Sequence, residues 1–360
     1  MADSDLHFPP AEVAPRLLDW YGRSGRDLPW RNTRDPYRIW LSEIMLQQTR
    51  VTAVIGYYRR FLNNHSTVEQ LAAAPPEKII DLWAGLGYYA RARNLHAAAK
   101  MVVEEFAGIF PSTVDELQKL PGVGRSTAGA IAALAFDRRA PILDGNVRRI
   151  LCRLFALREP PRSTAAEKQL WQWSERLTPE QDVHDYTQAM MDLGATVCVP
   201  RKPLCTDCPL NDLCCACQLG LEQELPLQQA AKKLPLRHEV ALLLERQGGY
   251  LVRRRLSSGF LGGLWEFPSI GLNDREPAEA KLPLLMADLG VTGEAQFLGS
   301  ISHIYSHFRL ELQIYRLSTE DLPQVAETEN DWCAAAQLSD LALHGAHKKA
   351  LGKLPGEIGG

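Results

Sequence analysis

The hydrophobic pattern of the chain changes near residue 220, and this change constrains the fold more than any other feature. Before it, apolar residues recur at helical spacing, as in 35–62 and 125–136. After it, segments such as 239–246 and 302–317 are rich in β-branched and aromatic residues, which are typical of strands. Since one core rarely exceeds roughly 250–300 residues, a chain of 360 residues with two patterns predicts two domains. We expect a mainly α domain followed by an α+β domain.

The expected boundary is a polar stretch that contains proline. We place the α domain at 1–225, a linker at 226–236, the α+β domain at 237–350 and a tail at 351–360. No segment has the pattern of a signal peptide or the roughly 20 apolar residues of a membrane helix, so we expect a cytoplasmic protein without membrane contact.

Eight cysteines are present, and four are crowded near the end of the α domain. Four thiolates so close together can surround one metal centre, and their spacing suits tetrahedral zinc and an iron–sulfur cluster about equally well. A disulfide framework is uncommon in a cytosolic chain. Two further cysteines, at 215 and 217, blur the assignment of the fourth ligand. The candidate ligands are Cys198, Cys205, Cys208 and Cys214.

A second motif, Leu-Pro-Gly-Val-Gly at 120–124, precedes a small apolar helix. Its glycines permit a positive φ and leave backbone N–H groups unshielded, while the helix N-terminus adds further free N–H groups. We therefore expect Gly122, Gly124 and Ser126 to hold phosphate without side-chain charge, although an ordinary helix–turn–helix connection is the competing interpretation. The formal net charge of −3 excludes an overall basic nucleic-acid binder, so contact with DNA would depend on local patches and backbone donors.

Several segments together carry a resemblance to a known family. The hairpin, the cysteine cluster and the segments LPWR (28–31), WLSEIMLQQT (40–49), GLGYYARARNL (85–95) and LDGNVRRIL (143–151) resemble the helix-hairpin-helix DNA glycosylases that carry a 4Fe-4S cluster. Within that superfamily the chain is similar to the MutY family of adenine DNA glycosylases. The resemblance implies an iron–sulfur module at 198–214 and a C-terminal Nudix-like domain. The helix at 276–290 lacks the glutamates that bind magnesium in Nudix hydrolases, so we expect recognition there rather than phosphohydrolysis.

The resemblance assigns the chemistry to two carboxyl groups. Glu43 lies among apolar residues of a helix, where burial raises a carboxyl pKa, and its family counterpart protonates adenine N7. The counterpart of Asp144 stabilises the sugar cation, and Asn146 would position water or Asp144. Ser126 stands where strand-cutting relatives have a lysine that forms a Schiff base, so we expect hydrolysis without strand cleavage. The competing interpretations are a solvated glutamate for Glu43 and helix capping for Asp144 and Ser126.

Other contacts also follow from the resemblance. We expect Arg31 to contact a flipped adenine, and Gln188 to reach the edge of the adenine or simply to face solvent. Leu28 and Trp30 would line the adenine pocket or simply pack in the core. Gln48 and Tyr88 would fill the gap in the base stack, and Thr49 would contact the opposite base. A C-terminal segment would read 8-oxoguanine, unless it is an ordinary edge strand; its residues are Tyr305, Ser306 and His307.

These inferences predict a monomeric, monofunctional glycosylase. Its expected partner is double-stranded DNA that contains adenine opposite 8-oxoguanine or guanine, and in a bacterium it would be associated with the nucleoid. Ser126 and the second domain disfavour a thymine-glycol type of glycosylase/lyase, and the two carboxyl groups disfavour a non-catalytic damage-binding protein. A metal-binding regulator is the weakest alternative.

Overall fold

The computed structural model describes residues 8–228, 233–256, 259–273, 276–320 and 330–354. Contacts divide the chain into two compact units, of which the first joins residues 1–74 to 93–231 and the second joins 75–92 to 232–360. The grouping of 75–92 with the second unit differs from the predicted domain that runs unbroken from 1 to 225. Each unit is described by itself.

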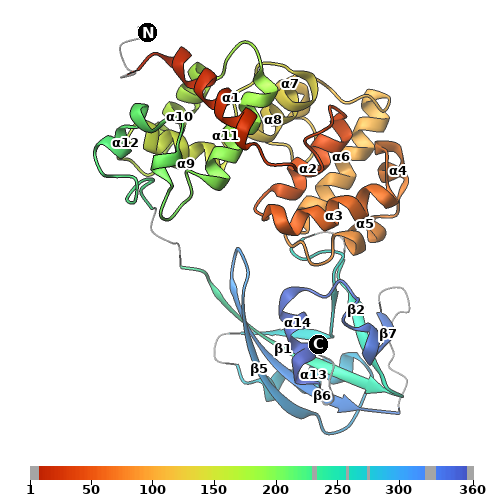
Figure 1. The fold of residues 1–360 in the computed structure, drawn as a ribbon. Helices are drawn as coiled ribbons and strands as arrows, with labels where there is room; N and C mark the ends of the chain where they lie inside the picture. Colours follow the sequence, from red (N-terminus) through yellow and green to blue (C-terminus); the bar gives the residue numbers. More distant parts are fainter. Residues whose placement is uncertain (1–7, 229–232, 257–258, 274–275, 321–329, 355–360) are drawn as a thin grey trace. The chain divides into compact units, whose positions relative to one another are not determined.

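The first unit is helical, as the spacing of apolar residues predicts (Figure 1). Two of its helices, α2 and α3, arise from the single apolar pattern at 35–62, which Gln48 interrupts with a φ of 58°. The α-helices described between residues 13 and 218 are α1 (Val13–Ser24), α2 (Pro36–Leu46), α3 (Val51–Asn64), α4 (Val68–Ala73), α5 (Pro76–Trp83), α6 (Ala90–Phe106), α7 (Val114–Leu117), α8 (Arg125–Phe136), α9 (Gly145–Leu154), α10 (Thr164–Leu177), α11 (Val183–Thr196) and α12 (Cys215–Gln218). Of these, α5 and the first residues of α6 fall within the segment 75–92.

The packing of the first unit centres on α8 and α11. Helix α11 contacts α1, α8 and α9, and α8 also contacts α2. Small side chains allow this close approach, since α8 buries a run of alanines and a glycine. A Cβ atom on Gly129 would lie 2.5 Å from the carbonyl oxygen of Pro141, so only glycine fits there. Helix α8 therefore packs directly against the backbone of the segment that precedes α9.

The second unit contains a mixed β-sheet, as the strand-like pattern predicts. Its main strand order is β3-β2-β1-β6-β5, where β1 and β6 are parallel, while β4 pairs with β1 and β7 with β2. The strands are β1 (Leu236–Arg246), β2 (Gly249–Arg254), β3 (Trp265–Glu266), β4 (Ser269–Leu272), β5 (Gln296–Ile304), β6 (Arg309–Ser318) and β7 (Asn330–Ala334).

Alternating side chains of β1 and β6 supply two cores, one on each face of the sheet. Leu243 and Leu312 pack on the face covered by α14 (Gly345–Ala350), while Leu242 and Leu317 pack on the face covered by α13 (Ala278–Asp288). Leu351 and Leu354 are also buried in the core beside α14, so the folded chain continues past the predicted domain end at residue 350. Similarly, β1 begins at Leu236, within the predicted linker.

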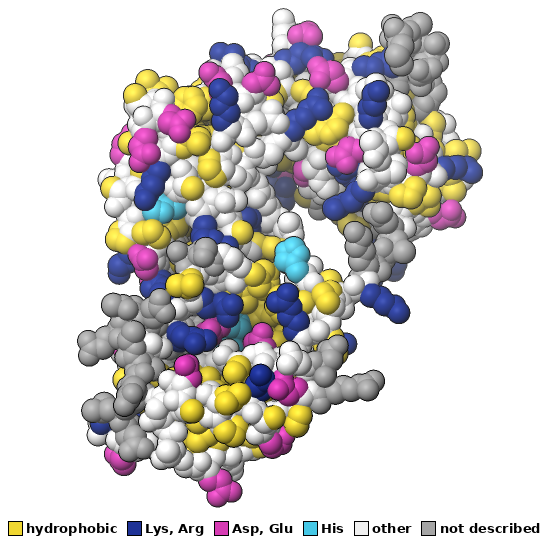
Figure 2. All heavy atoms as spheres, turned by 180° about the vertical axis from the view of Figure 1, so that it is seen from behind, with side chains coloured by type: hydrophobic (Ala, Val, Ile, Leu, Met, Phe, Trp, Pro, Cys, Tyr) yellow, Lys and Arg dark blue, Asp and Glu magenta, His cyan; other side chains and the backbone are white. Residues whose placement is uncertain are grey.

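The described surface carries both signs of charge. Lysine and arginine side chains alternate with aspartate and glutamate on the face that Figure 2 presents. This mixture agrees with the small net charge of −3. No helix among the described residues is long and apolar enough to cross a membrane.

Candidate active site

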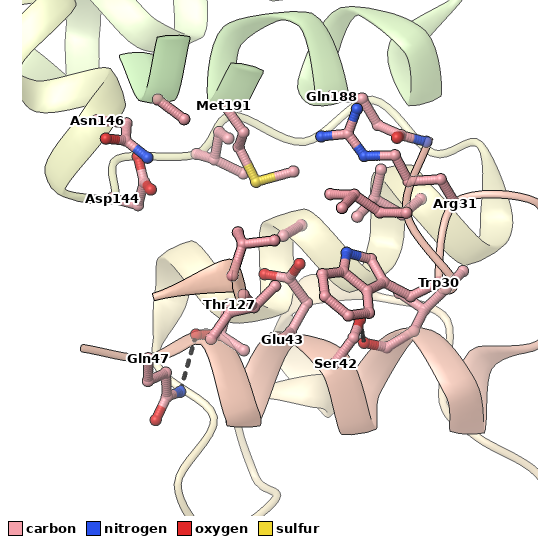
Figure 3. Close-up of a pocket in the computed structure, with 18 of the residues that line it drawn as sticks. Trp30, Arg31, Ser42, Glu43, Gln47, Thr127, Asp144, Asn146, Gln188 and Met191 are labelled. Carbon is pink, nitrogen blue, oxygen red and sulfur yellow. Dashed lines mark hydrogen bonds between the residues drawn. The ribbon is translucent and has the colours of Figure 1, made fainter. Parts of the chain in front are cut away.

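A pocket of about 210 Å³ lies in the first unit between residues of α2, α8, α11 and the start of α9 (Figure 3). The structure brings most of the predicted site residues together here, although they come from distant parts of the sequence. The predicted residues that line the pocket are Leu28, Trp30, Arg31, Glu43, Thr49, Ser126, Asp144, Asn146 and Gln188.

Glu43 projects from α2 into this pocket (Figure 3). The neighbouring side chains Ile39 and Leu46 also line it, which makes the surroundings of the carboxyl group apolar. Burial, and secondarily the charge of Asp144, raises the pKa of Glu43 to about 7. The predicted rise in this pKa is therefore confirmed, and the interpretation of Glu43 as a solvated surface residue is wrong.

Asp144 faces the same cavity from the N-terminus of α9. Its Oδ1 accepts a hydrogen bond from Val147 N at 2.8 Å, so the predicted helix cap is confirmed. Burial raises the pKa of this carboxyl group, and hydrogen bonds from the Val147 and Asn146 backbone oppose the rise. The cap fixes the carboxyl group while leaving it within the pocket lining.

Asn146 is held in place by the side chain of Arg149. Arg149 Nη2 donates to Asn146 Oδ1 at 2.8 Å and to the Gly194 carbonyl at 2.6 Å, and its Nε donates to the Cys198 carbonyl at 2.7 Å. The Asn146 amide oxygen is thus fixed by a residue one helical turn away. The doubled arginine at 148–149 was the visible signal, but sequence alone does not tell which arginine turns inward.

Ser126 does not cap α8, contrary to one interpretation of the sequence. The N-cap of this helix is Gly124, and Ser126 Oγ instead accepts a hydrogen bond from Leu143 N at 2.9 Å. In the hairpin, Gly122 has a φ of 79° and uses the freedom of glycine, whereas Gly124 has an ordinary φ of −86°. The tight turn therefore depends on the first glycine alone.

Arg31 is bound by a buried acid, Asp192, that sequence analysis missed. Arg31 Nη1 lies 2.5 Å from Asp192 Oδ2, Arg31 Nη2 pairs with Oδ1, and Arg26 also bonds both oxygens through its guanidinium and backbone N–H groups. Asp192 is fully buried, and although burial opposes ionisation, the hydrogen bonds from Arg31 and Arg26 lower its pKa. Its place four residues after Gln188, on the same face of a helix, is the signal that could have revealed it.

The side chain of Gln188 is already engaged on both sides. Its Oε1 accepts from Tyr21 Oη at 2.9 Å, and its Nε2 lies 2.8 Å from His184 Nε2. Arg31 Nη1 also donates to Tyr21 Oη at 3.2 Å. Gln188 and Arg31 therefore belong to one polar network on the wall of the pocket.

The remaining predicted contacts divide into two groups. Leu28 and Trp30 are buried, with only 7% of each residue's surface exposed, and both line the pocket. The two residues therefore pack in the core and form part of the pocket wall. Gln48 and Tyr88 are exposed, adopt positive φ angles and are not among the pocket's lining residues. Their role beside an extruded base stays a prediction.

The four predicted cysteine ligands line a separate small cavity in the first unit. Tetrahedral zinc, with Zn–S bonds of about 2.3 Å, requires sulfurs roughly 3.8 Å apart. Among the described residues, no three cysteine sulfurs all lie within 4.8 Å of one another. This wider spacing fits a cluster in which each thiolate binds a different iron.

A buried cation supports the same cavity. Arg153 is 2% exposed, and its Nη1 lies 3.3 Å from Cys198 Sγ and 2.8 Å from the Val199 carbonyl oxygen. Burial raises the pKa of the Cys208 thiol to about 12 and that of the Cys214 thiol to about 11, so a metal must displace protons when it binds. The donor set and the positive charge fit an iron–sulfur cluster.

In the second unit, the predicted recognition residues form a turn between β5 and β6. Tyr305 N donates to the Phe308 carbonyl at 2.9 Å, and Ser306 and His307 are exposed. The competing interpretation of this segment as an edge strand is wrong, since β5 ends at Ile304. Phe260, which sequence analysis missed, packs edge-on against the rings of Tyr305, His307 and Phe308.

A buried polar network lies behind this turn. Tyr305 Oη is 2.7 Å from His344 Nδ1 and accepts from Ala346 N at 3.1 Å, while His344 Nε2 lies 3.5 Å from Glu266 Oε2. Burial opposes ionisation of Glu266, but His344 and Arg255 lower its pKa to about 2. Because Glu266 is ionised, the proton of neutral His344 belongs on Nε2, which leaves Nδ1 to accept from Tyr305.

Glu266, His344 and His347 also place three metal-binding atoms within 4.8 Å of one another. However, His347 Nδ1 accepts a hydrogen bond from Phe267 N at 2.8 Å, so its Nε2 carries the proton of the neutral ring. Arg253 and Arg255 already neutralise Glu266. Glu266 and His344 thus interact with each other, whereas His347 Nε2 is buried without a hydrogen-bond partner among the described residues.

Family comparisons agree with this geometry. Residues 41–176 match the HhH-GPD superfamily of base excision DNA repair proteins, residues 198–214 match the iron–sulfur binding domain of endonuclease III, and residues 239–353 match the NUDIX domain. The solved structure of a thermostable thymine-DNA glycosylase aligns with a TM-score of 0.54 and 31% identity over 59% of this chain and 97% of its own. The fold and site thus define a base excision DNA repair glycosylase with a 4Fe-4S cluster.

Two relatives narrow the class further. An adenine DNA glycosylase from Mus musculus is 38% identical over 92% of this chain and 76% of its own length. Another, from Buchnera aphidicola subsp. Acyrthosiphon pisum, is 35% identical over 82% of this chain and 83% of its own. The chain belongs to the adenine DNA glycosylases, the enzymes that hydrolyse the N-glycosidic bond of adenine in DNA.

Proposed function

We propose that this glycosylase removes adenine paired with 8-oxoguanine, and less readily adenine paired with guanine, without cutting the strand. The observation that carries the reaction is the presence of Glu43 and Asp144 in one pocket, the first with its pKa raised to about 7. The observation that supports recognition is the turn at 305–308, in which Ser306 and His307 are exposed and Tyr305 contacts a buried network behind them.

In the proposed mechanism, Glu43 acts as the general acid. Its proton moves to N7 of the flipped adenine, and the electrons of the breaking C1′–N9 bond pass to the base, which leaves as neutral adenine. A pKa of about 7 keeps a large fraction of the carboxyl group protonated near neutral pH. The apolar neighbours of Glu43 are therefore part of its function.

Asp144 and Asn146 serve the sugar and the water. A carboxylate beside the developing positive charge at C1′ stabilises it. Water then adds to C1′ and gives its proton to the Glu43 carboxylate, which regenerates the general acid. Asn146 is positioned by Arg149 to orient the water or the Asp144 carboxylate. The products are free adenine and an intact abasic strand.

Binding of the base would involve the opposite wall of the pocket. Arg31 and Gln188 present polar groups to the edge of adenine, and Leu28 and Trp30 contact its face. Thr49 would contact the opposite base, with Gln48 and Tyr88 filling the vacated stack. The hairpin backbone around Gly122 and Gly124, together with Ser126, would hold the phosphates.

The cofactor, a 4Fe-4S cluster, would be held by Cys198, Cys205, Cys208 and Cys214. It would supply a rigid structural support for the surrounding loop and not a redox centre, since hydrolysis of a glycosidic bond transfers no electrons. Arg201 and Lys202, both exposed between the first two ligands, would meet DNA phosphate.

The 8-oxoguanine preference would arise at Ser306. 8-Oxoguanine carries a hydrogen on N7, where guanine has an acceptor, and the Ser306 hydroxyl can accept that hydrogen. Because a hydroxyl can also donate, this contact discriminates by only about 1 kcal/mol. Tyr305 and His307 would contribute through packing and phosphate contact.

The decisive experiment measures single-turnover excision from matched duplexes with adenine opposite 8-oxoguanine or guanine, read with and without alkali. We expect strand breaks only after alkali, and Ser306→Ala should reduce the preference for 8-oxoguanine several-fold. Ser300→Ala, which removes an exposed hydroxyl from β5, is the matched control. Rapid strand cleavage before alkali would contradict the proposal that the enzyme hydrolyses the glycosidic bond without cutting the strand. An unchanged preference for 8-oxoguanine in Ser306→Ala would contradict the proposal that the turn at 305–308 recognises this base.

A further inference from the structure

The cavity that holds the cluster contains one thiol more than a 4Fe-4S cluster needs. A cluster of this type takes four thiolates, yet Cys217 lines the cavity together with the four ligands. Cys215, two residues earlier in the same short helix, is not among its lining residues. The geometry therefore distinguishes two neighbouring cysteines that the sequence leaves equivalent.

Cys217 is also directed at particular ligands. The helix α12 starts immediately after Cys214, so Cys217 lies on the same side of the chain one turn later. Its thiol is within hydrogen-bonding distance of the Cys205 thiol, and its backbone N–H contacts the Cys214 thiol. Its Sγ also donates to Asn211 Oδ1 at 3.1 Å, which fixes the side chain facing the cavity. Cys205 and Cys217 thus present two sulfurs to one corner of the site.

We propose that Cys217 is a reserve ligand of the cluster, able to bind the iron that Cys205 normally holds. In the exchange, the bond between iron and Cys205 Sγ breaks, the bond between iron and Cys217 Sγ forms, and the Cys217 proton passes to the departing Cys205 thiolate or to water. No electron is transferred. The cluster would then survive chemical loss of the Cys205 thiolate, for example by oxidation to a sulfenic acid with peroxide.

A set of alanine variants tests this proposal through the iron and acid-labile sulfide content of the purified chain. Cys205→Ala should retain close to the wild-type iron content, whereas Cys205→Ala/Cys217→Ala should lose at least one iron per chain. Cys205→Ala/Cys215→Ala is the matched control and should behave like Cys205→Ala. Equal iron loss in Cys205→Ala and in Cys205→Ala/Cys217→Ala would overturn the proposal.

A second measurement leaves all four cluster ligands unchanged. Its result therefore holds even if Cys205→Ala does not fold. Wild type, Cys217→Ala and Cys215→Ala are treated with hydrogen peroxide, and loss of visible absorbance from the cluster is followed. We expect Cys217→Ala to lose its cluster several-fold faster than the other two, because it lacks the reserve sulfur. Equal rates in all three would contradict the proposal, and neither readout depends on base excision.

Discussion

Ser126 Oγ accepts a hydrogen bond from the backbone N–H of Leu143, the residue directly before Asp144, at 2.9 Å. This bond joins the start of the helix after the hairpin to the segment that carries a proposed catalytic carboxyl group. Ser126 therefore positions backbone in the pocket, in addition to lacking the amine that forms a Schiff base.

Replacing the Ser126 hydroxyl tests whether it positions the backbone of the pocket and whether the missing amine prevents strand cleavage. Ser126→Lys should introduce borohydride-trappable strand cleavage, provided that the new amine reaches C1′, while Ser126→Ala should slow excision by a few-fold through loss of one hydrogen bond worth about 1 kcal/mol. Trapped complex and single-turnover excision are the measurements. Efficient trapping in the unmodified chain, at the rate of base loss, would falsify the monofunctional mechanism.

The pKa of Glu43 predicts how excision depends on pH. The general acid must be protonated, and burial raises its pKa to about 7, so the single-turnover rate should fall as the pH rises above 7. At saturating enzyme, the fall should approach tenfold per pH unit. Glu43→Gln should abolish most of the activity but retain DNA binding. A rate that stays level between pH 6 and pH 9 contradicts the assignment.

The same group should make stability depend on pH. Its pKa rises from 4.5 to about 7 in the folded chain, so the folded state binds its proton more tightly than the unfolded state. Well below pH 4.5 the carboxyl group is protonated in both the folded and the unfolded state, so its burial does not lower the free energy of unfolding. As the pH rises past 7, burial of the ionised carboxylate lowers the free energy of unfolding by an amount on the order of 3 kcal/mol. We therefore measure the free energy of unfolding in urea for Glu43→Gln and for wild type. The amount by which the variant exceeds wild type should be larger at pH 8.5 than at pH 5.5. Equal differences at the two pH values would count against burial of the ionised carboxylate.

Sequence reasoning located the proposed catalytic carboxyl groups through the family resemblance, because local context alone is equally compatible with a solvated glutamate at Glu43 and a routine helix cap at Asp144. Glu43 stands among apolar residues at helical spacing, and Asp144 precedes a helix as a cap. The two-part architecture followed from the switch between helical and strand periodicity. Such local patterns can be recognised in a sequence without any knowledge of the fold.

Contacts between distant segments could not be predicted in this way. Asp192 binds Arg31 and Arg26 across more than 160 residues, and only the packing of α11 beside α1 brings them together. Likewise, Gln48 appears within a helical pattern, and nothing in the pattern marks the positive φ at which the helix breaks. Such features depend on tertiary packing rather than on local propensity.

Asp192 offers a test of how Arg31 is positioned. Asp192→Asn leaves two guanidinium groups beside a buried amide, and breaking such a pair costs about 3–5 kcal/mol. We expect a large loss of stability in urea unfolding and weaker excision, since Arg31 loses its fixed orientation. Asp185→Asn, which changes an exposed acid on the same helix, should affect stability far less. Comparable losses in both variants would show that helix charge, and not the buried pair, is responsible.

The hydroxyl of Tyr305 provides the last test, which concerns recognition of the opposite base. It joins the turn at 305–308 to His344 Nδ1 at 2.7 Å and to Ala346 N at 3.1 Å. Tyr305→Phe keeps the ring packing but removes both hydrogen bonds, which are worth about 1 kcal/mol each. The turn should lose its fixed position, and the preference for 8-oxoguanine over guanine should fall several-fold. Excision of adenine opposite guanine should stay unchanged, because the pocket with Glu43 and Asp144 is untouched. Tyr315→Phe, on the β6 strand and in the other core, is the matched control and should leave the preference intact. If Tyr305→Phe slows excision from both duplexes equally, the network stabilises the fold in general and does not serve recognition.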